Sequence, residues 1–249
     1  MYYEVEGRGR PLVLLHGGVG STDLFRTFRS RMGRSRRLIS VDLQAHGRTM
    51  DLERPLRYEL LGDDVAGLIR YLGLGVADLL GYSLGGGVAL RAAVQHPRQV
   101  RKLILVSAPF RRDGWYPEIR RAMARDPKTA ARQLRDTPMH RTYLRVAPRK
   151  DDWLRLLTKL HELLSREYDW SRDLQRLSAP TLIVVGDADS VRPSHAVEFY
   201  ERLGGGKRDG RWDGSRIPKS SLVILPRTTH YEICDSPLLP PVVSQFVDA

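Results

Sequence analysis

A serine flanked by glycines offers the best combination of residue type and setting for chemistry in this chain. Ser83 lies in the segment GYSLG at residues 81–85, between a short apolar run at residues 78–80 and a helical pattern that continues to about His96. G-x-S-x-G at such a junction is typical of a sharp strand-to-helix turn that strains the central residue and exposes its hydroxyl. The flanking glycines avoid collisions with neighbouring backbone. Ser83 is therefore the candidate nucleophile, and it needs a base because a serine hydroxyl alone is a weak nucleophile.

The base is expected to be a histidine late in the chain. His230 follows the last apolar run, in the segment PRTTHY at residues 226–231, and the histidine comes last in this motif's order of serine, acid and histidine. His195 follows the candidate acids too closely. The other five histidines fall in a glycine-rich loop, after an early strand, at a helix end or in a helical insertion: His16, His46, His96, His140 and His161. His230 is the favoured base.

Two carboxylates are candidates for the acid that orients this histidine. Both lie in the segment GDAD at residues 186–189, directly after a predicted strand at residues 181–186. The acid accepts the imidazole N–H, holds the tautomer and stabilises the imidazolium. We favour Asp189 on the motif's order of serine, acid and histidine. Asp187 remains the alternative, and its other role is that of a structural turn residue.

A glycine-rich loop early in the chain is the candidate oxyanion hole. The segment HGGVG at residues 16–20 follows the predicted strand at residues 12–15, where a flexible turn aims a backbone N–H at a developing negative charge. The amides of Gly18 and Leu84 would be the two donors. A phosphate-binding loop is the competing interpretation, but neither G-x-x-x-x-G-K-[ST] nor a helix-opening G-x-G-x-x-G is present. His16 is interpreted as a brace for this loop.

Short apolar runs alternate with helical patterns along the chain, which is typical of a mostly parallel sheet covered on both faces. Residues 2–6 and 12–15 are predicted to form an opening hairpin. Further strands are predicted at residues 38–42, 78–81, 102–107, 181–186 and 221–225, and covering helices at residues 61–72 and 85–96. Each strand ends in a loop that could carry chemistry.

The regular alternation stops at residues 111–177, a charged and helical segment. Its apolar stripe consists of Trp153, Leu156, Leu157, Leu160, Leu163 and Leu164, and this spacing is typical of one face of a helix. We expect residues 111–177 to be a helical cap inserted into a core domain formed by residues 1–110 and 178–249. A cap over the carboxyl edge of the sheet would form the roof of a pocket. Residues 204–219 are expected to be a surface loop.

Arginine dominates a strongly basic composition. The 249 residues carry a formal net charge of +12, and 35 of the 41 basic residues are arginines. These arginines are scattered from Arg8 to Arg227, whereas a nucleic-acid site gathers them into one patch or stripe. We expect a solvated basic surface, with neither nucleic acid nor a membrane as a partner.

The single cysteine, Cys234, rules out a disulfide within the chain and favours a reducing compartment. The first residues lack the basic start and apolar core of a signal peptide, and no apolar run approaches membrane-spanning length. A cytoplasmic protein is therefore expected, as a monomer or homodimer.

With these motifs in place, the sequence resembles the α/β-hydrolase superfamily over nearly its whole length. The HGG loop, the segment VDLQAHGR at residues 41–48, GYSLG, GDAD and TTHY follow one another in the family's order. One departure is Ala45, where the family usually has glycine. The resemblance implies the α/β-hydrolase fold, with a mostly parallel central sheet, helices on both faces and a helical cap. It also implies a triad of Ser83, Asp189 and His230, because the position of Asp189, three residues after Gly186, matches the family's pattern.

The resemblance further implies a reaction. A small carboxylic ester or lactone would be cleaved through an acyl-enzyme on Ser83, without a metal or organic cofactor, so that the partner is a small-molecule substrate. A serine at the turn argues against haloalkane dehalogenase and epoxide hydrolase activity, which use an aspartate there. Carbon–carbon bond hydrolases use the same triad, and some relatives act as slow-turnover ligand sensors, so both remain alternatives.

Overall fold

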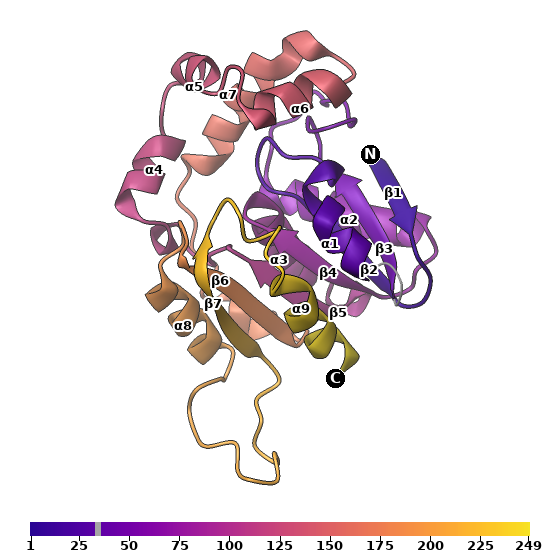
Figure 1. The fold of residues 1–249 in the computed structure, drawn as a ribbon, viewed down its shortest axis with the longest axis vertical. Coiled ribbons are helices and arrows are strands. Elements are labelled where there is room, and N and C mark those ends of the chain that lie inside the picture. Colours follow the sequence, from indigo (N-terminus) through magenta and orange to yellow (C-terminus); the bar gives the residue numbers. More distant parts are fainter. Residues whose placement is uncertain (33–35) are drawn as a thin grey trace.

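Seven strands form one sheet in the computed structural model, which describes residues 1–32 and 36–249 (Figure 1). The strands are β1 (Tyr2–Glu6), β2 (Pro11–Leu15), β3 (Arg37–Asp42), β4 (Ala77–Tyr82), β5 (Val100–Val106), β6 (Thr181–Ala188) and β7 (Ser221–Thr229). Their order across the sheet is β1-β3-β2-β4-β5-β6-β7. All neighbours are parallel except β1 and β3. The carboxyl ends of six strands therefore meet at one edge.

The prediction of an opening hairpin was wrong. β1 pairs with β3, with Tyr2 opposite Asp42, and β2 lies on the other side of β3. Four of the five residues of β2 are buried, whereas β1 is partly or fully exposed throughout. A strand buried on both faces belongs inside a parallel sheet, and a partly exposed strand suits an edge. This arrangement places β2 next to β4, so the loops that follow these two strands are neighbours.

Helices cover both faces of the sheet, as predicted (Figure 1). α2 (Tyr58–Tyr71), α3 (Leu84–Gln95) and α8 (Pro193–Arg202) pack on the face that Val13 and Leu15 point to. α1 (Arg26–Met32) and α9 (Leu239–Asp248) pack on the opposite face with Leu12 and Leu14. Successive side chains of β2 thus enter opposite cores, as the two-residue period of a strand requires.

A helical insertion separates β5 from β6 and lies above the carboxyl edge of the sheet (Figure 1). It contains α4 (Pro117–Met123), α5 (Pro127–Gln133), α6 (Pro138–Val146) and α7 (Trp153–Leu164). Three of these helices begin with proline, which is favourable there because the first N–H has no intrahelical acceptor. The apolar stripe predicted for residues 153–164 lies on α7. Short 3₁₀ helices complete the chain: η1 (Thr22–Phe25), η2 (Pro97–Gln99), η3 (Arg112–Gly114), η4 (Lys150–Asp152) and η5 (Asp173–Arg176).

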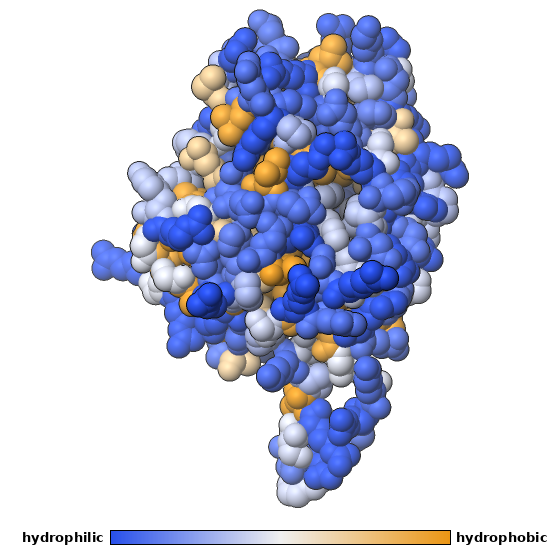
Figure 2. Space-filling view, turned by 180° about the vertical axis from the view of Figure 1, so that it is seen from behind, coloured by the Kyte–Doolittle hydropathy of each residue, from blue (hydrophilic) through white to orange (hydrophobic). Residues whose placement is uncertain are grey.

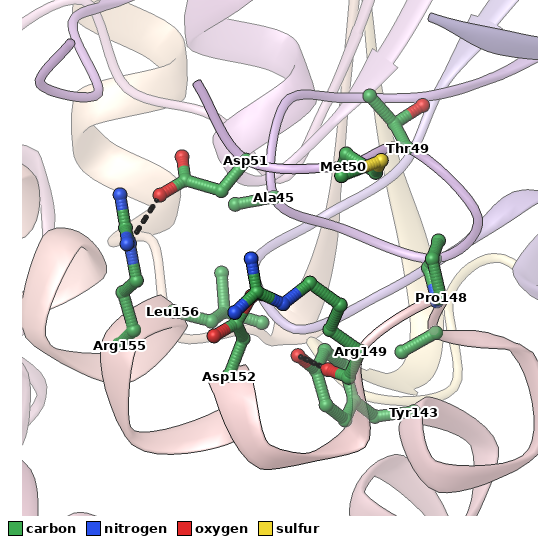
Figure 3. A pocket seen from close by; sticks show the side chains of 12 residues that line it. Ala45, Thr49, Met50, Asp51, Tyr143, Pro148, Arg149, Asp152, Arg155 and Leu156 are labelled. Atoms are coloured by element: carbon green, nitrogen blue, oxygen red, sulfur yellow. Dashed lines mark hydrogen bonds and ion pairs between the residues drawn. The ribbon is translucent and has the colours of Figure 1, made fainter. Parts of the chain in front are cut away.

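Charged side chains hold the insertion against the loop that follows β3. Asp51 accepts hydrogen bonds from Arg155 Nε at 2.6 Å and from Lys159 Nζ at 2.7 Å. Lys159 also donates to the carbonyl oxygens of Leu52 and Arg54. Burial alone would raise the pKa of Asp51, but the hydrogen bonds from Lys159 and Arg155 lower it below the ordinary value. Figure 3 shows Asp51 and Arg155 facing each other beside a space of about 20 Å³.

Residues 204–219 form an irregular excursion between α8 and β7. It projects from the end of the sheet opposite the insertion (Figure 1), and Trp212 within it is 99% exposed. Figure 2 shows a mostly hydrophilic surface on the reverse side, with apolar residues in small separate spots. None of the helices in residues 1–32 and 36–249 combines the length and apolar character needed to span a bilayer.

Candidate active site

Ser83 occupies the sharp turn between β4 and α3. Its backbone has a φ of 54° and a ψ of −116°, a strained conformation for a residue with a side chain. The turn requires glycine on both sides. A Cβ on Gly81 would lie 2.1 Å from the carbonyl oxygen of Gly85, and a Cβ on Gly85 would lie 2.2 Å from that of Leu15. These glycines therefore allow the turn that places Ser83 at the carboxyl edge of the sheet.

His230, at the end of β7, meets Ser83 at this edge. Its Nε2 lies 3.2 Å from Ser83 Oγ, and its Nδ1 lies 2.8 Å from Asp189 Oδ1. Tyr82, which precedes the serine, donates a hydrogen bond from its hydroxyl to the His230 carbonyl oxygen at 2.8 Å. The Trp115 ring packs edge-on against the imidazole, with 5.5 Å between ring centroids. The structure thus brings together the three side chains singled out in the sequence.

Asp189 is held by four hydrogen bonds. Oδ1 accepts from His230 and from the Val191 amide, and Oδ2 accepts from Ser107 Oγ at 2.5 Å and from the Gly186 amide at 3.1 Å. Burial alone would raise the pKa of Asp189, but the hydrogen bond and charge of His230, together with the Ser107 hydroxyl, lower it below its ordinary value of 3.8. The carboxylate is therefore ionised at neutral pH, as the partner of an imidazole that takes up a proton must be.

Gly18 and Leu84, whose amides are the predicted oxyanion donors, both line the cavity at Ser83. Leu84 is the first residue of α3, so its N–H has no acceptor within the helix and lies at the positive end of the helix dipole. Gly18 lines the same cavity as Ser83 and Leu84. The adjacent His16 is fully buried and accepts a hydrogen bond from the Leu43 amide at 3.1 Å, and its Nδ1 lies 2.7 Å from the Gly17 carbonyl oxygen. Burial lowers the pKa of His16 to about 4, so a neutral imidazole braces the loop.

The cavity above Ser83 has a volume of about 340 Å³. Its walls come from the sheet edge and from the insertion, and they are mostly apolar. The insertion contributes Trp115, Ile119, Ala122, Met123, Arg125, Pro127, Ala130, Leu134, Met139, Leu157, Leu160, His161 and Leu164. Within residues 1–32 and 36–249, no group of three or more His, Cys, Asp or Glu side chains is arranged to hold a metal ion.

The sequence of residues 12–241 matches the family model described as "Alpha/beta hydrolase family". The chain belongs to the alpha/beta hydrolase family. The predicted fold class, an α/β-hydrolase fold with a mostly parallel sheet, helices on both faces and a helical insertion, is confirmed.

Individual family members resemble the chain over most of its length. It is 31% identical over 219 residues to the AB hydrolase superfamily protein YisY of Bacillus subtilis, covering 78% of this chain and 79% of the relative. It is 25% identical to the pimeloyl-(acyl-carrier protein) methyl ester esterase of Nitrosomonas europaea, covering 92% of both chains. Among solved structures, MGS-M2, an alpha/beta hydrolase from a Medee basin deep-sea metagenome library, superposes with a TM-score of 0.78 at 19% identity, covering 100% of this chain and 94% of that chain.

Ser107 is a residue of this alpha/beta hydrolase site that the sequence analysis missed. It follows β5, is fully buried, has a φ of 53° and donates to Asp189. The sequence could have indicated this residue, because Ser107 is polar and directly follows the buried strand β5. In the sheet, β5 lies beside β6, the strand that leads to Asp189. Asp187, by contrast, accepts hydrogen bonds from the amides of Arg227 and Thr228 at 2.9 and 3.1 Å, so its carboxylate joins β6 to β7 and not to the imidazole.

The departure from the family's glycine at Ala45 has a structural consequence. Ala45 has a φ of 65°, in the left-handed region that glycine adopts without a steric penalty. Gly47 has a φ of 52°, and a Cβ there would lie 2.3 Å from Asp42 Cγ. The Asp42 carboxylate accepts hydrogen bonds from the amides of Thr22 and Arg48. This segment therefore ties the loop after β3 to the core, with strain stored at Ala45.

Proposed function

We propose that this hydrolase cleaves carboxylic esters through an acyl-enzyme on Ser83. The observation that carries the proposal is the unbroken chain of contacts from Ser83 Oγ to His230 and from His230 to Asp189, at the floor of an apolar cavity. A serine hydroxyl is activated when a base lies within hydrogen-bond reach and a third group orients that base. Both conditions are met at one edge of the sheet.

The geometry supports a two-step reaction. Ser83 Oγ attacks the ester carbonyl carbon while His230 Nε2 takes its proton, and the resulting oxyanion accepts hydrogen bonds from the Gly18 and Leu84 amides. Collapse of this intermediate breaks the bond to the alcohol, which leaves with the proton from His230. Water then attacks the acyl-enzyme with the same histidine as base, releases the acid and restores the Ser83 hydroxyl. Asp189 stays ionised throughout and stabilises the imidazolium.

Ser83 is preferred over Ser107 as the nucleophile, although both serines contact the histidine–acid pair. Ser83 lines the cavity and lies against His230 Nε2. Ser107 is fully buried, and its hydroxyl proton is directed to Asp189. Ser107 is therefore a positioning residue that holds the carboxylate.

The substrate class follows from the walls of the cavity. A mostly apolar space of about 340 Å³ lies at the lower end of the range for small-molecule sites and suits an ester or lactone with a modest apolar chain. The esterase named among the relatives also supports ester hydrolysis.

Hydrolysis of p-nitrophenyl esters from acetate to octanoate tests the proposal. We expect a rapid first burst of p-nitrophenol followed by slower turnover, because acyl-enzymes accumulate on activated esters. The burst and the turnover should both vanish in Ser83→Ala. Turnover retained in that variant would contradict the proposal, and a folded native protein without turnover would favour a carbon–carbon bond hydrolase or a ligand sensor.

A further inference from the structure

The described residues that line the cavity include a positive charge and no negative charge. Arg125 is the one charged side chain among the described residues that line it, and the lining contains neither Asp nor Glu. The remaining polar side chains near the floor are those of Tyr82, Ser83, Ser190, His230 and Tyr231. A substrate entering this space therefore meets apolar walls, the reactive serine and a single cation contributed by the insertion.

Arg125 lies in the short connection between α4 and α5, lines the cavity and is exposed to solvent. Its Nη1 donates to the neutral amide oxygen of Gln133 at 2.8 Å. Within the described part of the chain, no carboxylate lies within ion-pair distance of Arg125, whereas Arg145 and Arg155 of the same insertion pair with Asp23 and Asp51. The charge of Arg125 is thus available to an anion.

His161 is a polar residue in the part of the cavity roof that α7 forms, which is otherwise apolar. It lies on α7 between Leu157, Leu160 and Leu164, all of which line the cavity. Its Nδ1 lies 3.4 Å from Ser165 Oγ. No hydrogen bond to its Nε2 occurs among the residues that the structure describes, so this nitrogen is available to a polar group of the substrate.

Ser165 connects the end of the helix that carries His161 to the end of the helix that precedes Arg125. Ser165 Oγ lies 3.5 Å from the carbonyl oxygen of Met123, and Met123 is the last residue of α4, two residues before Arg125. The end of α7 is therefore next to the end of α4. His161, four residues before Ser165, and Arg125, two residues after Met123, both line the cavity near this junction in the chain.

We propose that Arg125 and His161 bind a carboxylate on the substrate, separated from the scissile carbonyl by an apolar chain. This inference rests on the proposed ester hydrolysis. The apolar walls contact the chain and the guanidinium pairs with the carboxylate. In the tautomer whose Nδ1 accepts from the Ser165 hydroxyl, the His161 Nε2–H donates a hydrogen bond to the same carboxylate. A neutral ester of equal length leaves the Arg125 charge without an ionic partner. The hydrolase is therefore selective for esters with an anionic end.

Matched ester pairs test this selectivity. Methyl alkanoates are compared with monomethyl esters of straight-chain dicarboxylic acids of equal length, by measuring released methanol. Acetate esters of ω-hydroxy acids are compared with alkyl acetates, which places the carboxylate on the alcohol side. We expect at least one of the two anionic series, at its best chain length, to have a higher kcat/KM than the neutral esters of equal length. High salt should reduce this preference, because mobile ions screen a partly exposed pair.

Variants locate the preference in the cavity. Arg125→Gln should reduce the ratio of kcat/KM for anionic over neutral esters about five-fold, through KM, which is the size expected for a partly exposed ion pair. Arg132→Gln is the matched control, because Arg132 carries the same charge on α5, donates to Thr129 and does not line the cavity. This control should retain the native ratio. His161→Leu should also reduce the ratio, by less than Arg125→Gln.

Each opposing outcome is distinct. Equal kcat/KM values for neutral and anionic esters in the native protein would overturn this inference while leaving ester hydrolysis standing. An equal loss of the ratio in Arg125→Gln and Arg132→Gln would also overturn it, since net charge alone would then be responsible. Absence of hydrolysis on every ester would instead overturn the proposed function.

Discussion

Two turns at the carboxyl edge of the sheet hold serines at nearly the same positive φ. Ser83 follows β4 with a φ of 54°, and Ser107 follows β5 with a φ of 53°. Both contact the histidine–acid pair, but from opposite ends: Ser83 lies at His230 Nε2, whereas Ser107 donates to Asp189 Oδ2. Only the first of these serines lines the cavity.

The difference shows that a strained turn places a hydroxyl without deciding its role. At Ser83 a helix begins directly after the serine, so a free amide and the helix dipole favour negative charge there. At Ser107 the side chain is fully buried, and its hydroxyl donates a hydrogen bond to the Asp189 carboxylate. Access to the cavity and the direction of the hydroxyl hydrogen bond therefore distinguish the proposed nucleophile, Ser83, from the proposed positioning residue, Ser107.

The largest expected effect separates these two serines by kinetics. Ser83→Ala should lower kcat by about 10⁵-fold, because removing the nucleophile leaves only binding and the oxyanion hole. Ser107→Ala should lower kcat by about 10-fold, since Asp189 loses one charge-assisted hydrogen bond. Steady-state rates on one p-nitrophenyl ester measure both. Comparable losses in the two variants would remove the distinction.

The next effect tests Asp189, which contacts Ser107 directly and Ser83 through His230. Asp189→Asn should lower kcat by about 10⁴-fold, because a neutral amide neither holds the required tautomer nor stabilises the imidazolium. Asp187→Asn is the matched control, since Asp187 bonds to the backbone amides of Arg227 and Thr228 and not to the imidazole. Rates near the native value in Asp189→Asn, or a similar loss in the control, would disprove the assignment.

Acid unfolding sharpens the account of the Asp189 hydrogen bonds. The pKa of Asp189 in the folded protein is lowered below its ordinary value of 3.8, so its ionised form contributes stability above that value. This contribution is lost as the pH falls through the lowered folded pKa. The gap in unfolding free energy between the native protein and Asp189→Asn should therefore narrow on acidification. A constant gap between pH 7 and the acid limit of folding would contradict the lowered pKa.

The smallest effect concerns backbone strain at Ala45, outside the group formed by Ser83, His230 and Asp189. Ala45 has a φ of 65°, and Ala45→Gly should raise the free energy of unfolding by about 0.5 kcal/mol, as relief of strain slightly exceeds the added chain entropy. Gly47→Ala is the opposing control, because the new Cβ would collide with Asp42 and destabilise the fold. Urea denaturation measures both, and a destabilised Ala45→Gly would show that Ala45 is not strained.

The motif-bearing residues could be predicted from sequence because local geometry specifies them. Ser83 needs small neighbours at a strand-to-helix turn, and the strands that lead to Asp189 and His230 are apolar runs with clear ends. Such features act over a few residues, so they are visible in a single sequence. The helices over residues 61–72 and 85–96 are predictable for the same reason.

Contacts between distant segments could not be predicted in this way. The pairing of β1 with β3 depends on which strand becomes buried on both faces, and this is decided by the whole sheet. Ser107 can donate to Asp189 because β5 and β6 are neighbours in the sheet, and this pairing is not visible in the sequence. The proposed joint role of Arg125 and His161 likewise depends on how α4 packs near α7, where Ser165 contacts the Met123 carbonyl oxygen.

Covalent labelling tests the central claim, that Ser83 is the activated serine, most directly. The native protein and the Ser83→Ala and Ser107→Ala variants are treated with a fluorophosphonate, and the modified peptide is identified by mass spectrometry. We predict a single adduct on Ser83 in the native protein, its retention in Ser107→Ala and its absence from Ser83→Ala. An adduct on Ser107, or labelling that persists in Ser83→Ala, would contradict the account.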